Sequence, residues 1–160
     1  MVNTNSEHGP DCTCGCHDHD HEHAHDHDHG HRHDHAAGRE VECRWGTAVL
    51  ESHVHDQAAT VSATIRAQSG SAATFEVLVE GLRSVAQHVE SAGGIVGHIK
   101  AYARADGSFV HASATDAQHE PSCEGDASLP LGPEVCCQLV AIALLIDLEQ
   151  LEQIVVDALN

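Results

Sequence analysis

Aromatic and basic residues are the scarcest groups in this chain of 160 residues. It has one Trp, one Tyr and two Phe, and its seven Lys and Arg stand against 25 Asp and Glu, for a formal net charge of −18. Base stacking on aromatic rings and neutralisation of phosphates by basic side chains are main contributions to nucleic-acid binding. The composition therefore argues against a nucleic-acid partner, and the negative charge argues against anionic membranes.

Long apolar runs are missing as well. The longest, Val135 to Ile146, is shorter than the roughly 20 residues that span a bilayer. Residues 1–6 have neither the basic start nor the apolar stretch of a secretory signal. The seven cysteines, an odd number in irregular clusters, do not form a spaced disulfide framework. We therefore expect a cytoplasmic protein, with no membrane partner, whose reduced thiols are free to bind metal.

Sequence signatures of catalysis are also absent. The chain contains no GxSxG, HExxH or dinucleotide-binding motif. Acidic residues are plentiful, but nothing in their spacing singles out an acid–base pair. We therefore expect a protein without enzymatic activity.

The N-terminal segment is rich in histidine, cysteine and aspartate. From His17 to His35 every odd-numbered residue is a histidine, and a Cys-Thr-Cys-Gly-Cys cluster stands directly before this tract. Residues 1–40 contain few aliphatic side chains, so burial cannot offset the entropy cost of ordering them. We expect a disordered metal-binding tail over residues 1–40 and a small folded domain over residues 41–160.

Imidazole and thiolate groups are preferred ligands of transition metals. Side chains two residues apart lie on the same side of an extended chain, about 6–7 Å apart, but on nearly opposite faces of a helix. The tract can therefore wrap an ion only as an extended or looping chain, and ten histidines accommodate about two to three ions at three or four imidazoles each. The predicted metal ligands are Cys12, Cys14, Cys16, His17, His19, His21, His23, His25, His27, His29, His31, His33 and His35.

Imidazole suits nickel, zinc, cobalt and copper, and the affinity order alone does not choose among them. The interleaved aspartates attract cations and raise the histidine pKa, so acidification should release metal while most imidazoles stay free near pH 7. Two other interpretations are an affinity tag and a functionless low-complexity run, and a third is that the thiols serve as a redox-sensitive group. A tag is usually a uniform block of six histidines, so the aspartates and adjoining thiols favour metal binding.

The cysteine cluster followed by His/Asp repeats resembles the N-terminal metal-binding tail of the hydrogenase nickel-incorporation GTPases. That tail has a short Cys-rich motif ending in Cys-Gly-Cys and often continues into a histidine-rich tract. The resemblance covers residues 12–35, and similar tracts occur in urease nickel chaperones and zinc transporters. The chain lacks a GxxxxGK[ST] phosphate loop, so GTP hydrolysis does not carry over. The resemblance implies nickel delivery or buffering, with hydrogenase or urease maturation as the process served.

Alternation of apolar and polar residues predicts two β-hairpins in the remaining sequence. Their turns are Asp56-Gln57 and the stronger Asp106-Gly107 pair. The four predicted strands cover residues 44–55, 58–67, 95–104 and 108–115.

Helical spacing of apolar residues predicts a helix over 75–89 that is stopped by Gly93-Gly94. Residues 116–132 look like a polar loop, and the apolar stretch after Pro133 predicts a buried helix to Ile146. Asp147 and Gln150 resemble a capping box that begins a further helix over 148–159. We expect an α+β fold in which a small antiparallel sheet, with the order ββαββα, is covered by helices on one face.

Four histidines of the domain fall on the polar faces of the predicted hairpins. His53 and His55 share the polar face of the first hairpin. His98 and His111 share the polar face of the second hairpin, where His111 lies across from Tyr102. They could form a second metal or ligand site on an open sheet face, although solvated strand residues are the more ordinary interpretation. Cys136-Cys137 is expected to act as a pair of small buried hydrophobic residues.

These patterns together predict an intracellular transition-metal-binding protein, for nickel or else zinc, that acts as a metallochaperone or buffer. The tail would capture ions, and the domain would dock on a recipient metalloprotein or on a second copy in a homodimer. One alternative is a small regulatory or ligand-binding domain whose tail only modulates it in response to metal. A third hypothesis is an assembly factor that acts through protein contacts.

Overall fold

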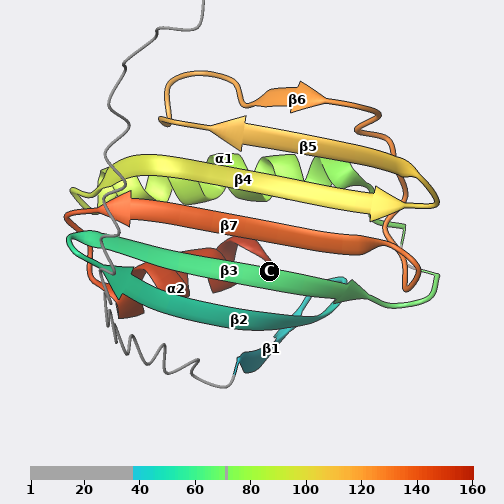
Figure 1. Cartoon of the computed structure of the whole chain (residues 1–160), viewed down its shortest axis with the longest axis horizontal. Coiled ribbons are helices and arrows are strands. Elements are labelled where there is room, and N and C mark those ends of the chain that lie inside the picture. The colour runs from blue at the N-terminus through green and yellow to red at the C-terminus, as the bar shows by residue number, and fades with distance from the viewer. Residues whose placement is uncertain (1–37, 71) are drawn as a thin grey trace, which may run out of the picture. The chain divides into compact units, whose positions relative to one another are not determined.

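The computed structural model describes residues 38–70 and 72–160. Within them, seven antiparallel strands form one sheet with the spatial order β1-β2-β3-β7-β4-β5-β6 (Figure 1). Two helices, α1 (Phe75–Ser91) and α2 (Leu148–Ala158), lie on one face of this sheet (Figure 1). The strands are β1 (Arg39–Cys43), β2 (Gly46–His55), β3 (Ala58–Ala67), β4 (Ile95–Ala105), β5 (Ser108–Ala114), β6 (Ser122–Glu124) and β7 (Cys136–Leu144). The predicted antiparallel α+β architecture is confirmed, but the predicted order ββαββα is wrong, because the chain runs βββαββββα.

Both predicted hairpins are present with the predicted turns. Strand β2 pairs with β3 so that His55 lies opposite Ala58, and β4 pairs with β5 so that Ala105 lies opposite Ser108. Asp106 and Gly107 both have positive φ, at 41° and 82°, as a type I′ turn requires. Local turn chemistry therefore fixes the register of both hairpins, and with it which side chains face the helices.

The stretch after Pro133 forms a strand and not the predicted helix. Residues Cys136–Leu144 form β7, which lies between β3 and β4 and joins the two hairpins into one sheet. A mostly apolar run, here interrupted only by Gln138, fits a central strand as well as a buried helix, because a central strand packs apolar side chains on both faces. The predicted loop 116–132 also contains the short edge strand β6.

Helix α1 forms as its apolar spacing predicts, and it supplies the centre of the core. Phe75, Leu78, Leu82, Val85 and Val89 are all buried. Gly81, which lowers the intrinsic helix propensity of this segment, faces α2, and a Cβ there would lie 3.1 Å from the Ala158 carbonyl oxygen. The glycine therefore permits close approach of the two helices. The sheet side of this core is made mainly of small residues, namely Ala48, Ala59, Ala63, Ala101, Ala103, Ala112, Ala141 and Ala143.

Helix α2 begins at the predicted cap. The Asp147 carboxylate accepts a hydrogen bond of 2.8 Å from the Gln150 backbone N–H, which satisfies one of the free donors of the first turn. Further along the helix, Glu152 accepts hydrogen bonds from Arg39 of β1 and Ser52 of β2. These contacts attach α2 to the β1–β2 end of the sheet. Within the described ranges, no helix has the length and apolar character needed to cross a membrane.

Candidate functional site

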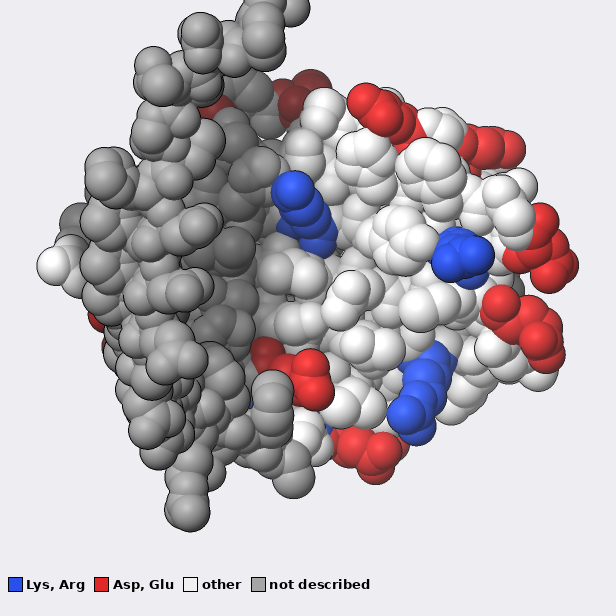
Figure 2. Space-filling view, in the orientation of Figure 1, with Lys and Arg blue, Asp and Glu red and all other residues white. Residues whose placement is uncertain are grey.

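The predicted metal ligands from Cys12 to His35 lie outside the residues that the structure describes. The candidate site within those residues is the face of the sheet turned away from the helices, here called the open face. It is made of the outward side chains of β2, β3, β7, β4 and β5, which alternate with the buried core residues along each strand. Figure 2 views this face, where separate blue patches lie on a mainly white surface and red side chains gather toward the rim.

The register of the strands places the open-face residues in rows that cross the sheet. His53 lies beside Thr60, which pairs with Ile142, which in turn pairs with His98. As predicted, His98 and His111 lie on the same face, and His111 pairs directly with Tyr102.

Spacing within the rows decides whether these histidines can share an ion. His53 and His98 are three strand spacings apart, about 14 Å, whereas a metal ion needs nitrogen ligands at about 2 Å. The His111 Nδ1 lies 3.9 Å from the Glu124 carboxylate, and this pair amounts to only two potential metal ligands. Across residues 38–70 and 72–160, no group of three or more His, Cys, Asp and Glu gathers in a way that could hold a metal ion. The open-face histidines therefore fit the interpretation of solvated strand residues.

A second cluster lies in the loop between β5 and β6, beside a pocket of about 180 Å³. Asp116 Oδ1 accepts hydrogen bonds of 2.9 Å from the backbone N–H groups of His119 and Gln118, and His119 Nδ1 lies 2.9 Å from the same oxygen. The bond from the His119 N–H contributes most to lowering the pKa of Asp116 below its ordinary value. Glu120 is paired with Arg83 of α1. These contacts hold the loop, and among the described residues the cluster does not bring together the three ligand groups that a metal ion needs.

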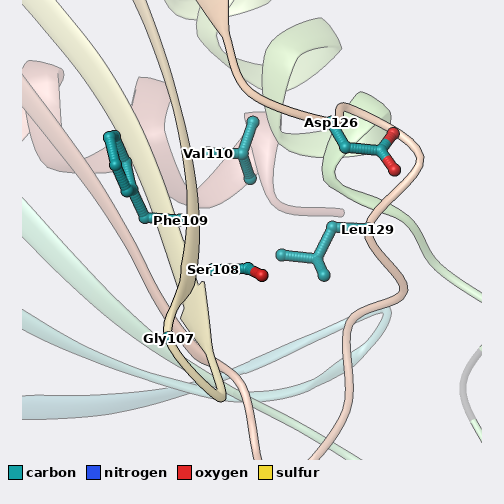
Figure 3. Close-up of a pocket in the computed structure, with 6 residues that line it drawn as sticks. All are labelled: Gly107, Ser108, Phe109, Val110, Asp126 and Leu129. Atoms are coloured by element: carbon teal, nitrogen blue, oxygen red, sulfur yellow. The ribbon is translucent and has the colours of Figure 1, made fainter.

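A larger pocket of about 330 Å³ lies between the start of β5 and the loop before β7 (Figure 3). Its walls are Val110, Leu129 and the Ser108 side chain, while the Phe109 ring lies on the opposite side of the strand (Figure 3). The Asp126 carboxylate at its rim is bound by the Ser128 hydroxyl, which lowers the pKa of Asp126. The pocket therefore offers the Ser108 hydroxyl and apolar surface, with the Asp126 carboxylate held at its rim by Ser128.

The adjacent cysteines of β7 have opposite environments, because successive strand residues face opposite sides of the sheet. Cys137 is fully buried among core residues, and this burial raises the pKa of its thiol to about 11, with a smaller contribution from Cys136. Cys136 is exposed on the open face. The expectation that both are buried therefore holds for Cys137 only.

Alkylation of the folded protein should separate the two thiols. At mildly alkaline pH, iodoacetamide should label Cys136 and leave Cys137 unmodified, as measured by peptide mass spectrometry, because only the thiolate reacts. In the folded protein the pKa of Cys137 is about 11, above its ordinary value of 9.0. The free energy that the neutral, buried thiol contributes to folding is therefore fully present below pH 9, and it is lost as the pH rises toward about 11. Equal labelling of both thiols in native protein would contradict this placement.

Comparisons with known proteins give no relative that assigns a function to these residues. No protein-family model, curated protein or solved structure matches this chain.

Proposed function

We propose that this chain binds divalent transition-metal ions through residues 12–35, with nickel first and zinc second, and serves as a metallochaperone or metal buffer. The observation that supports this proposal is the unbroken alternation of histidine from His17 to His35 behind three closely spaced thiols. This pattern supplies the borderline and soft ligands that these ions prefer, and it offers almost no apolar surface that would serve a packed core.

The charge of the chain supports capture and release of cations. Six of the nine residues between the tract histidines are acidic, and the formal net charge is −18. Negative potential raises the local concentration of divalent cations and speeds their encounter with the ligands. Because many equivalent imidazoles follow one another, an incoming ligand can replace one imidazole at a time, and metal transfer then proceeds by stepwise ligand exchange.

Metal titration of the full, reduced chain tests this proposal directly. Nickel, zinc, cobalt and copper would be added separately and in competition, with calorimetry and native mass spectrometry as readouts. We expect about two to three nickel or zinc ions per chain, as counted from three or four imidazoles per ion. Replacement of the ten tract histidines by asparagine should remove most of this binding.

The domain histidines provide the matched control. Replacement of His53, His55, His88, His98, His111 and His119 by glutamine removes imidazoles from the described residues and leaves the tract intact. The stoichiometry of this variant should equal that of the unmodified chain. Failure of the full chain to take up nickel or zinc at micromolar supply, or unchanged uptake by the tract variant, overturns the proposal.

Transfer kinetics distinguish a chaperone or buffer from a metal store. The loaded chain would be mixed with increasing concentrations of a chromogenic chelator, and the rate of metal loss would be followed by absorbance. Stepwise ligand exchange predicts a rate that rises with chelator concentration. A slow rate that is independent of chelator would indicate dissociation from a closed site and would contradict delivery.

A further inference from the structure

The open face has an apolar centre that no element within the described ranges covers. Strand β7 directs Val140, Ile142 and Leu144 to this side, and each is only partly buried by its neighbours. Ile95 continues the apolar surface at one end with 53% of its area exposed. An antiparallel sheet that faces water normally alternates apolar and polar residues, so an apolar central strand on this side indicates that another surface packs there.

The edges of the sheet are poorly suited to a partner strand, which leaves the face as the docking surface. Edge strand β1 carries Arg39, Glu40 and Glu42 within five residues, and edge strand β6 is only three residues long. Charged and very short edge strands are the usual means of preventing edge-to-edge pairing.

Charges on the open face are complementary across one particular line. Glu51 on β2 and Lys100 on β4 lie in the same row, with Ser62 and Val140 between them. They are therefore equally distant from the midline between β3 and β7. We propose that the open face binds the open face of a second copy of this chain, about a two-fold axis that runs along this midline parallel to the strands.

This axis exchanges β2 with β4 and so places Glu51 of each copy opposite Lys100 of the other. It also exchanges β1 with β5, which brings Glu40 opposite His111, because these two residues share the adjacent row. The apolar residues of β7 pack at the centre between these polar pairs. Such an interface has an apolar core with a polar rim, as stable protein interfaces do.

Two alternative two-fold axes bring like charges together. An axis perpendicular to the strands through the same row would place Lys100 over Lys100 and Glu51 over Glu51. An axis along β7 would exchange β3 with β4 and place Arg66 near Arg104, since both flank the Cys136 end of β7. Like charges facing each other destabilise an interface, so the midline between β3 and β7 is favoured.

The face is large enough for a stable dimer. Five central strands at about 4.8 Å spacing and about nine residues at 3.4 Å rise cover roughly 700 Å². A standard protein interface buries about 800 Å² on each partner. Figure 2 looks onto this surface, where white and blue atoms predominate in the part that grey atoms do not cover.

Charge reversal at the two complementary positions tests the arrangement. The full chain would be studied with reduced thiols and excess chelator, so that metal ions do not bridge two copies, by sedimentation velocity over a range of concentrations. We expect a dimer for the unmodified chain. Glu51→Lys and Lys100→Glu should each raise the dimer dissociation constant at least about tenfold, because each variant creates two like-charge contacts. The double variant should restore dimerisation.

The matched control is Glu80→Lys on α1, which makes the same charge change on the opposite side of the sheet and should leave the dimer unchanged. All the substituted residues are exposed, so thermal unfolding should show that each variant is folded. A monomer at high micromolar concentration overturns the proposal and leaves the open face to a different protein. A double variant that dimerises no better than the single variants overturns the proposed axis. Neither outcome affects the metal-binding proposal, because metal is absent from the measurement.

Discussion

Replacement of Phe75 by alanine is expected to lower the free energy of unfolding by about 3–5 kcal/mol. Phe75 is fully buried at the start of α1, among the largest side chains of the core. Its backbone N–H donates to the Leu129 carbonyl oxygen at 2.9 Å, and this bond stays in the variant. The loss therefore measures the missing ring and the cavity that it leaves, and it is a large share of the roughly 5–15 kcal/mol that stabilises a typical domain.

Phe109 provides a matched control, because it is the only other phenylalanine and is 58% exposed. Phe109→Ala should change the free energy of unfolding by less than about 1 kcal/mol. Urea unfolding followed by fluorescence of the buried Trp45 measures both variants, since the chain has a single tryptophan. The comparison is made at low protein concentration, where association of open faces does not contribute. Similar losses for both variants would contradict the described core.

Metal affinity should fall by about a thousandfold for each pH unit below the histidine pKa, which is ordinarily about 6.5. Only neutral imidazole binds metal, so protons compete at every ligand, and a site with three imidazoles loses about tenfold per ligand per unit. Neighbouring aspartates favour imidazolium and should raise the pH at which this loss begins. The nickel dissociation constant, measured by competition with a chelator of known affinity between about pH 7.5 and 5, tests this dependence.

The contribution of the aspartates can be isolated within the same tract. Replacement of Asp18, Asp20, Asp26, Asp28 and Asp34 by asparagine keeps every imidazole and removes five of the six negative charges between the tract histidines, leaving Glu22. In this variant the loss of affinity should begin at lower pH. Affinity that stays constant down to about pH 5 would exclude histidine ligands and would point to another binding mode.

Much of the fold follows from local sequence signals. Asp106-Gly107 specifies a tight turn, the spacing of Phe75, Leu78 and Leu82 specifies one helix face, and Asp147 specifies a cap. Each of these signals acts within a few residues, so the register of both hairpins and the start of α2 could be predicted from the sequence.

The strand β7 could not be predicted in this way, because its identity depends on distant partners. Residues 136–144 are strand rather than helix because β3 and β4 supply unpaired edges on both sides of them. The sequence predicted that His98 and His111 share a face, but it did not show that Val140 and Ile142 lie between the hairpins. The apolar centre of the open face therefore became apparent only from the strand order. The metal ligands at 12–35 stay predictions that rest on their chemistry.

The position of β7 also governs when this protein can fold during synthesis. The strand that comes last along the chain is the one at the middle of the sheet. Until the ribosome has released Leu144, the β2–β3 and β4–β5 hairpins each expose an inner edge with unpaired amide and carbonyl groups. During that interval a nascent chain can pair with its neighbour on the same messenger instead of with its own missing strand. The delay between release of Ala114 and release of Leu144 from the ribosome should therefore influence the yield of native protein.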